Sequence, residues 1–346
     1  MNRCFKPFVK LAKKFIWLNA GALCRVLNRP AENGVLILQY HSISPLKSRE
    51  LWYIHPSLSI HPRDFERQMA IVRRYFEPVS LGRLLRWVDE GQNARKLPLA
   101  VTFDDGYRDN FTHAFPILRK YNIPATFYLT SECMDAKNPL WTTELRGLIL
   151  NSSRSNIVLS TLACAHKLKD PASRLGAIRD IKARMVKLPR NQREIAMEEI
   201  RRETAASRRH TDEMKRVMLK WEHVERMLRC GMDFGAHTMT HPSLPHIPVD
   251  EAMVEIAGSR TAIEARIGRH VLHFCYPNPG DVPHFNARIQ RILKNFGFLS
   301  AVTSIPGRFT WDADLLALKR KGIYRPYHRS PAEFFFWLQR EALTIA

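Results

Sequence analysis

The stretch Leu99-Ala-Val-Thr-Phe-Asp-Asp-Gly-Tyr107 predicts a buried strand that ends in two adjacent carboxylates. Its first five residues are apolar and partly β-branched, which is typical of a strand covered on both faces. Asp104 and Asp105 follow where the strand ends, and Gly106 allows a sharp turn. Successive side chains of an extended chain point in opposite directions, so the two carboxylates can serve different purposes, such as metal binding and proton transfer. An Asp-Asp-Gly turn is also common without any function, so this stretch alone leaves both interpretations open.

Strand-like and helix-like segments alternate on both sides of this stretch. Residues 111–121 have helical character and lead into an apolar run at 124–130 that is typical of a second buried strand. The alternation resumes after residue 230. Further strand-like runs lie at residues 35–39, 233–236, 271–276, 298–303 and 318–324. Strand, helix and strand in this order predict a parallel α/β architecture, in which the loops that follow the strands gather at one end.

Between residues 131 and 230 this alternation stops, and little strand signal follows residues 157–162. The segment predicts a helical insertion rather than a separate fold. Its charged helical stretches lie at residues 173–188, 191–206 and 212–229. Residues 151–230 carry 19 basic and 10 acidic side chains. This surplus suits an anionic substrate or a membrane, but a solvated helical excursion explains it equally well.

The N-terminal segment is strongly basic, with seven Lys or Arg and no acid in the first 30 residues. Its apolar residues recur at helical spacing, which predicts a basic amphipathic helix over residues 1–32. Such a helix can lie on an anionic membrane through residues 3–29, or it can dock against the main domain with its basic face in solvent. No apolar run approaches the length of a transmembrane helix. No small-residue cleavage site follows residues 15–24, so we expect the N-terminus to be retained.

The composition is that of a globular protein with a sizeable core. Of the 346 residues, 45% are hydrophobic, which excludes a disordered chain. The 54 Lys and Arg against 33 Asp and Glu give a formal net charge of +21, which favours polyanions or anionic membrane surfaces as partners. No nucleic-acid-binding motif accompanies this charge, so we expect no specific nucleic-acid partner. The six cysteines lie far apart without a CxxC pair, so we expect free thiols in a reducing compartment.

A histidine pair follows another predicted strand, in the sequence His237-Thr-Met-Thr-His241. Two histidines at positions i and i+4 of a helical turn share one face and can bind one metal ion. Because Asp105 also follows a strand, the three side chains can converge at one end of the sheet. One Asp and two His leave open positions on zinc, as a catalytic site requires, and zinc in such a site activates water near neutral pH.

Four motifs together resemble the polysaccharide deacetylases of the NodB homology type, carbohydrate esterase family 4. They are Tyr40-His41, Thr102-Phe-Asp-Asp-Gly106, His237-Thr-Met-Thr-His241 and Phe274-Cys-Tyr-Pro-Asn278. The resemblance covers about residues 33–130 and 231–325, is nearest in pattern to the poly-N-acetylglucosamine deacetylase-like members, and leaves 131–230 outside. It implies a distorted (β/α) barrel with a helical insertion, and metal-dependent removal of an N- or O-acyl group from a sugar.

The resemblance also implies a role for each residue of the first two motifs. Asp104 corresponds to the general base, and Asp105, His237 and His241 correspond to the metal ligands. Zn²⁺ is the expected ion, with Co²⁺ or Ni²⁺ as alternatives. Asp104 would take a proton from water as it attacks the amide carbonyl, which is the usual task of a general base.

Two departures from the family pattern concern the residues around this base. Many members have a late Leu-x-His motif that supplies the general acid, and here the late candidate His328 fits it poorly. In the poly-N-acetylglucosamine deacetylase-like members an early strand-end His performs this task, which makes His41 the candidate general acid. Many members also place an Arg, which pairs with the base, before the third motif's proline, and this chain has Cys275-Tyr276-Pro277 there. Arg320 is the candidate to replace it.

The remaining predictions concern the substrate and the organisation of the chain. Arg320 is also assigned to substrate binding, together with Tyr276, Pro277 and Asn278, which we expect to shape the sugar pocket. The predicted segments are the N-terminal helix at 1–32, the first barrel part at 33–130, the helical insertion at 131–230, the second barrel part at 231–330 and a C-terminal helix at 331–346.

The leading hypothesis is a metal-dependent deacetylase of an N-acylated sugar in polysaccharide or glycan-precursor metabolism, such as exopolysaccharide assembly. We expect a cytoplasmic protein, peripheral on the inner face of the membrane, that meets a glycan or a lipid-linked or nucleotide-linked sugar there. A diphosphate on that precursor would suit the basic surplus. The alternative is a catalytically weak deacetylase-like module that binds anionic glycan or membrane lipid, and the two departures around the base motivate it.

Overall fold

The computed structural model describes most of the chain. The described residues are 35–45, 53–90, 96–136, 138–205, 212–214, 216–277, 284–310, 312–325 and 330–339. The predicted N-terminal helix at 1–32, Asn278 and His328 lie outside these residues. Among the helices of the described part, none is long and apolar enough to cross a membrane.

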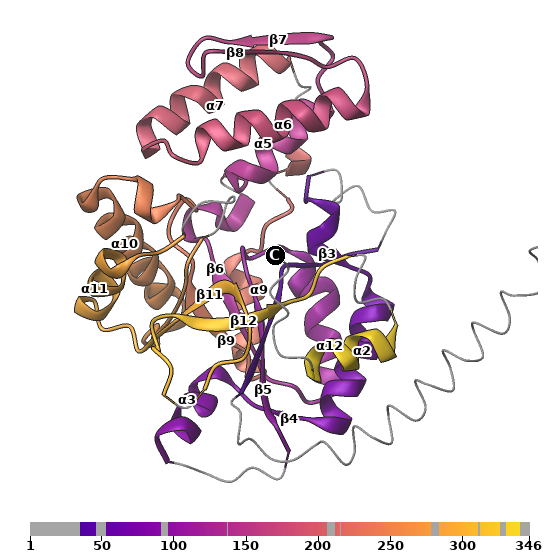
Figure 1. The fold of residues 1–346 in the computed structure, drawn as a ribbon, viewed down its shortest axis with the longest axis vertical. Coiled ribbons are helices and arrows are strands. Elements are labelled where there is room, and N and C mark those ends of the chain that lie inside the picture. The colour runs from indigo at the N-terminus through magenta and orange to yellow at the C-terminus, as the bar shows by residue number, and fades with distance from the viewer. Residues whose placement is uncertain are drawn as a thin grey trace, which may run out of the picture.

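Seven parallel strands close into a barrel, which occupies the centre of Figure 1. Around the ring they follow the order β1-β12-β11-β10-β9-β6-β5, and β1 pairs with β5 to close it. The strands are β1 (Leu36–Tyr40), β5 (Pro98–Phe103), β6 (Ala125–Leu129), β9 (Asp233–Ala236), β10 (His273–Cys275), β11 (Ser300–Pro306) and β12 (Leu318–Gly322). A short strand, β4 (Glu77–Pro78), pairs with β5 outside the ring. The predicted (β/α) barrel is confirmed.

Alternate residues of each strand face the surrounding helices and the barrel interior, because side chains alternate along a strand. In β1, Leu38 and Ile37 belong to two different apolar clusters. The cluster of Ile37 also contains Cys275 of β10 and side chains of the helix Leu81–Glu90. The next inward position of β1 is Gln39, which is polar and buried. Arg320 of β12 is a second buried polar side chain. The interior thus changes from apolar to polar toward the carboxyl ends of the strands.

Helices cover the outside of the barrel (Figure 1). They are α2 (Pro62–Tyr75), α3 (Leu81–Glu90), α4 (Phe115–Lys120), α9 (Trp221–Arg229), α10 (Val249–Ile267), α11 (Ala287–Asn295) and α12 (Pro331–Gln339). In α2, Phe65, Met69 and Val72 are fully buried at helical spacing, and His61 caps its N-terminus by accepting from the backbone N–H of Arg63. Shorter elements are β2 (Ser42–Ile43), β3 (Ser59–Ile60), η2 (Pro56–Leu58), η3 (Asn110–Ala114), η4 (Ser131–Ala136) and η5 (Leu244–His246).

A layer of helices between β6 and β9 stands beyond one end of the barrel, at the top of Figure 1. It consists of α5 (Trp141–Leu150), the antiparallel hairpin of β7 (Asn156–Leu159) and β8 (Cys164–Lys167), α6 (Pro171–Met185) and α7 (Arg190–Thr204). These elements share an apolar cluster of their own, in which Leu145, Ile181 and Met197 are buried. Hereafter these elements are called the helical layer.

The structure corrects the predicted helix at 212–229. Met218 forms an isolated antiparallel bridge with Tyr107, and Leu219 donates a backbone hydrogen bond to Gly106. Because these bonds hold the chain extended beside the loop after β5, the helix α9 begins only at Trp221. The buried side chains of α9 belong to the barrel's apolar cluster, so α9 packs as part of the barrel wall.

Candidate active site

The carboxyl ends of β1 and β5 bring His41 next to Asp104. Tyr40 and Phe103 are paired in register, and the Asp104 N–H donates to the Tyr40 carbonyl at 3.0 Å. Asp105 then adopts a left-handed backbone conformation with φ of 75°. The two carboxylates diverge through this turn, and not through the extended geometry that the sequence suggested.

The segment from His237 to His241 follows β9 as a loop, so the predicted helical turn is wrong. Thr238 and His241 both have positive φ, 65° and 61°. The Thr238 hydroxyl accepts from the His241 N–H at 3.0 Å, and the Glu255 carboxylate of α10 accepts from the N–H groups of Met239 and Thr240 at 2.8 and 2.9 Å. These side-chain acceptors replace the backbone acceptors of a helix.

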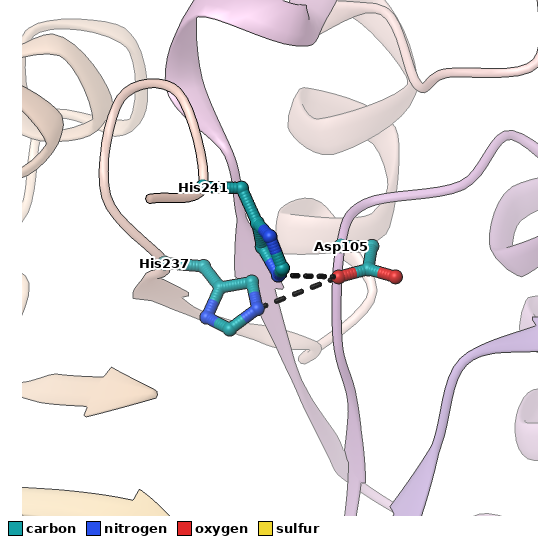
Figure 2. Close-up of side chains that lie close together, drawn as sticks. All are labelled: Asp105, His237 and His241. Atoms are coloured by element: carbon teal, nitrogen blue, oxygen red, sulfur yellow. Dashed lines mark ion pairs between the residues drawn. The ribbon is translucent and has the colours of Figure 1, made fainter. Parts of the chain in front are cut away.

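Asp105, His237 and His241 nevertheless converge on one point (Figure 2). The Nε2 atoms of both imidazoles lie 3.4 Å from Oδ1 of Asp105. All three side chains are at least nine-tenths buried. The Nδ1 atom of His237 lies 2.7 Å from the carbonyl oxygen of Cys275, which directs Nε2 toward the other two residues. This donor set and its outer hydrogen bond fit a divalent metal such as zinc.

The protonation of the three groups is coupled. Burial would raise the pKa of Asp105, but the hydrogen bond from His237 and the charge of His241 lower it to about 2. Burial and the neighbouring His237 lower the pKa of His241 to about 3. Burial also opposes protonation of His237, but Cys275 and Asp105 raise its pKa above the ordinary value. These directions favour a proton on His237 beside the Asp105 carboxylate, and metal binding would release it.

Asp104 is held by a different set of side chains. Arg320 donates from Nη1 to Oδ1 and from Nη2 to Oδ2, both at 2.7 Å, and Gln39 donates to Oδ2 at 2.8 Å. Burial would raise the pKa of Asp104, but the Arg320 guanidinium outweighs it and holds the pKa well below the ordinary value. The Nε2 atom of His41 lies 3.8 Å from Oδ2 of Asp104. Asp104 is therefore ionised at neutral pH beside an imidazole.

A cavity of about 310 Å³ opens over these residues. His41, Asp104, Asp105, His237, His241 and Tyr276 all line it, as the sequence predicted for a common site. The hydroxyl of Tyr276 donates to the Leu316 carbonyl at 2.8 Å, so the Tyr276 side chain is fixed in place. Pro277 is buried, and Asn278 is outside the described residues.

Arg320 does not line the cavity, so its predicted contact with the sugar is corrected. Its side chain is fully buried, and besides Asp104 it donates from Nε to the Thr303 carbonyl at 2.7 Å. The guanidinium thus makes its hydrogen bonds to the Asp104 carboxylate and to the backbone inside the barrel. This is the position that the sequence offered as the alternative, in which Arg320 pairs with Asp104.

Sequence reasoning missed two groups of cavity residues. Gln39 was missed because it lies inside an apolar strand, although its inward parity in β1 was a usable signal. Arg146 and Lys182 were missed because nothing in the sequence of a helix indicates that one of its basic residues turns toward a site more than 40 positions away along the chain. Both come from the helical layer and line the same cavity.

The family model for polysaccharide deacetylases matches residues 91–301, more than half of the chain. The chain belongs to this family. The matched residues contain Asp104, Asp105 and both histidines of the triad, whereas His41 and Arg320 lie outside them. The family resemblance seen in the sequence is confirmed.

One relative from Bacillus subtilis (strain 168) resembles part of this chain. It is YxkH, whose name assigns it provisionally to the polysaccharide deacetylases. The two proteins are 28% identical over 105 residues, which are 30% of this chain and 34% of YxkH. The match therefore spans only about a third of that relative.

Solved structures of two bacterial proteins share the fold. The Streptococcus pyogenes deacetylase PplD, in complex with acetate, superposes with a TM-score of 0.59 at 18% identity, over 90% of this chain and 100% of PplD. IcaB from Ammonifex degensii superposes with a TM-score of 0.51 at 17% identity, over 89% of this chain and 97% of IcaB. At these identities the likeness concerns the fold alone.

Proposed function

We propose that this member of the polysaccharide deacetylase family removes an acyl group, expected to be acetyl, from an N-acylated sugar of a polysaccharide or glycan precursor. The observation that carries the proposal is the position of an ionised carboxylate, Asp104, beside the Asp105–His237–His241 triad in one cavity. A divalent metal, expected to be Zn²⁺ with Co²⁺ or Ni²⁺ as alternatives, supplies Lewis acidity that polarises a carbonyl and activates water when bound by such residues.

The proposed task of Asp104 is to accept a proton from the attacking water. Arg320 and Gln39 fix the direction of its carboxylate, so the acceptor oxygen does not have to be ordered during the reaction. The low pKa keeps Asp104 ionised and so able to accept a proton. The leaving amine needs a proton in its turn, so a general acid must stand within reach of it.

His41 is the proposed general acid. It lines the cavity, its side chain is 12% exposed, and its Nε2 lies 3.8 Å from Oδ2 of Asp104. The late alternative, His328, is outside the described residues. In this arrangement Asp104 accepts a proton from the attacking water, and His41 donates a proton to the leaving amine. The two residues follow the neighbouring strands β5 and β1.

Two finer proposals concern the setting of the reaction. We propose that the substrate is a lipid-linked or nucleotide-linked precursor, and that the protein lies on the inner face of the cell membrane through residues 3–29. The net charge of +21 supports both, because a diphosphate and an anionic bilayer each attract basic surfaces.

Acetate release from N-acetylglucosamine oligomers and monosaccharides tests the activity. The wild-type protein is expected to release acetate and to lose this activity with a chelator. Asp104→Asn is expected to reduce acetate release at least about 100-fold without loss of bound metal, since one general base typically contributes 10²–10⁴-fold. Unchanged turnover in Asp104→Asn would contradict the proposal and favour binding without catalysis.

A further inference from the structure

The cavity over the triad has a second, basic wall that the proposed reaction does not use. Arg146 of α5 and Lys182 of α6 line it, together with His55 from the loop before η2. On α6, Ile178 and Lys182 are one helical turn apart and both face the cavity. The helical layer therefore supplies a positively charged side to a site whose reacting groups come from the barrel.

Arg146 is the unusual member of this wall. Its side chain is only 8% exposed, and its Nε is buried without a hydrogen-bond partner among the described residues. Other deeply buried arginines have acceptors: Arg320 has Asp104, and Arg193 donates to the Thr240 hydroxyl at 2.7 Å. Burial lowers the pKa of Arg146, with no carboxylate of the described residues opposing that effect. An unpaired cation in a cavity is costly unless something else neutralises it.

The cavity's own carboxylates do not neutralise Arg146. Asp104 accepts both branches of Arg320, and Asp105 faces the two histidines of the triad. The charges of the basic wall instead act on His55, another residue that lines the cavity. After burial itself, the charges of Arg146 and Lys182 lower the pKa of His55. The charges of Arg146 and Lys182 therefore reach the part of the cavity where His55 lies.

His55 adds a neutral donor to this wall. Its Nδ1 accepts from the Ser57 N–H at 3.3 Å, which places the proton of the neutral imidazole on Nε2. Two cations and an N–H donor around one cavity are a suitable set for an oxyanion. The planar fork of an arginine suits a phosphate with two parallel hydrogen bonds, and a lysine adds a point charge.

We propose that Arg146 and Lys182 bind a phosphate or diphosphate on the same sugar whose acyl group the triad end of the cavity removes. This inference rests on the proposed function, and it names the substrate class as an N-acylated sugar phosphate. Phosphate is preferred to a carboxylate because it offers oxygens both to the planar fork of Arg146 and to the ammonium group of Lys182. A carboxylated sugar is then an outcome of the test.

Three N-acetylated sugars that differ in charge test the substrate class. They are N-acetylglucosamine 1-phosphate, the neutral methyl glycoside of N-acetylglucosamine, and N-acetylmuramic acid, which carries a carboxylate. For the wild-type protein, kcat/KM on the 1-phosphate is expected to exceed that on the methyl glycoside at least tenfold. Equal values for these two sugars, or a preference for N-acetylmuramic acid, would overturn the phosphate site while leaving the deacetylase proposal intact.

Charge variants locate the phosphate site. Arg146→Gln and, separately, Lys182→Gln are expected to lower the ratio of kcat/KM on the 1-phosphate to that on the methyl glycoside by about 10- to 100-fold. Arg179→Gln is the matched control, because Arg179 is an exposed residue of α6 and its loss removes the same charge. A ratio that falls equally in Arg179→Gln would overturn the site, since bulk charge would then explain it.

Binding without turnover separates this inference from the proposed function. Calorimetry with N-acetylglucosamine 1-phosphate is expected to show at least tenfold weaker binding to Arg146→Gln than to wild-type protein or Arg179→Gln. This result would support the phosphate site even if no acetate were released, in which case the proposed function would fail alone. Equal affinities for the three proteins would overturn the site.

Discussion

Arg320 and Asp104 form a bidentate ion pair in the barrel interior, with both N–O distances 2.7 Å, although 216 residues separate them. Arg320 is fully buried and Asp104 is 2% exposed. Only the closure of the ring brings them together, because β1 then pairs with β12 on one side and with β5 on the other. The pair explains how a carboxylate can remain ionised inside the protein.

Loss of the Arg320 charge is expected to destabilise the protein strongly. Arg320→Gln leaves Asp104 buried without its counter-ion, which typically costs about 3–5 kcal/mol. Arg320→Lys should cost less but still reduce acetate release, since an ammonium cannot reproduce the planar fork. Urea unfolding measures the stability, and Lys319→Gln on the exposed side of β12 is the control. A stability of Arg320→Gln within 0.5 kcal/mol of the control, a margin typical of surface changes, would contradict the importance of the pair.

Replacement of His41 tests the proton donor. His41→Gln is expected to lower kcat by about 10²- to 10⁴-fold, the usual contribution of a general acid. Bound metal should stay at the wild-type level because His41 is not one of the three converging ligands. Steady-state kinetics and elemental analysis of one preparation check both parts. If His41→Gln kept the wild-type kcat, His41 would not be the general acid and another residue would have to donate the proton.

Glu255 is expected to control the affinity of the metal site through the loop between the two histidines. Its carboxylate accepts from the backbone of Met239 and Thr240 and from the Thr240 hydroxyl. Glu255→Gln replaces one acceptor oxygen by an NH₂ group, which should weaken metal binding by about 10- to 100-fold, as losses of outer hydrogen bonds do. Titration against a metal indicator measures the affinity. The exposed Asp250→Asn on α10 is the control, and an affinity of Glu255→Gln equal to that control would count against this role.

His284 is expected to make the stability depend on pH below neutrality. Burial and Arg320 lower its pKa from 6.5 to about 4, and its Nε2 accepts from the Ser304 N–H at 3.2 Å. The unfolded chain therefore binds this proton more readily, so stability falls as the pH falls from 6.5 toward 4, by at most about 3 kcal/mol. The free energy of unfolding of His284→Gln should change less with pH in this window than that of the wild-type protein. His270→Gln, at a side chain 83% exposed, should keep the wild-type slope, and identical slopes for all three proteins would refute the assignment.

The sequence was sufficient for the convergence of the triad, because the carboxyl ends of parallel strands meet at one end of a barrel. It could not predict the shape of the loop from His237 to His241, since Glu255 on a later helix supplies the acceptors that oppose a helical turn. The sequence also could not predict the direction in which the Arg320 side chain points. A strand residue can face the sugar or the interior, and only the ring closure between β1 and β5 decides which.

The helical layer shows a second limit of the sequence. A basic surplus in residues 151–230 was visible, but surplus charge does not reveal which residue is buried. Arg146 precedes that region, and its burial follows from the packing of α5 in the layer's apolar cluster. The hairpin of β7 and β8 and the extended segment around Met218 likewise depend on tertiary pairing, with each other or with the loop at Tyr107.

Metal reconstitution tests the central claim most directly. Chelator-treated wild-type protein should bind one equivalent of Zn²⁺ and regain acetate release from N-acetylglucosamine substrates in proportion to the metal bound, whereas His237→Ala, which lacks one converging ligand, should do neither. Full acetate release by metal-free wild-type protein, or by His237→Ala, would contradict the claim that this triad holds the metal on which the reaction depends.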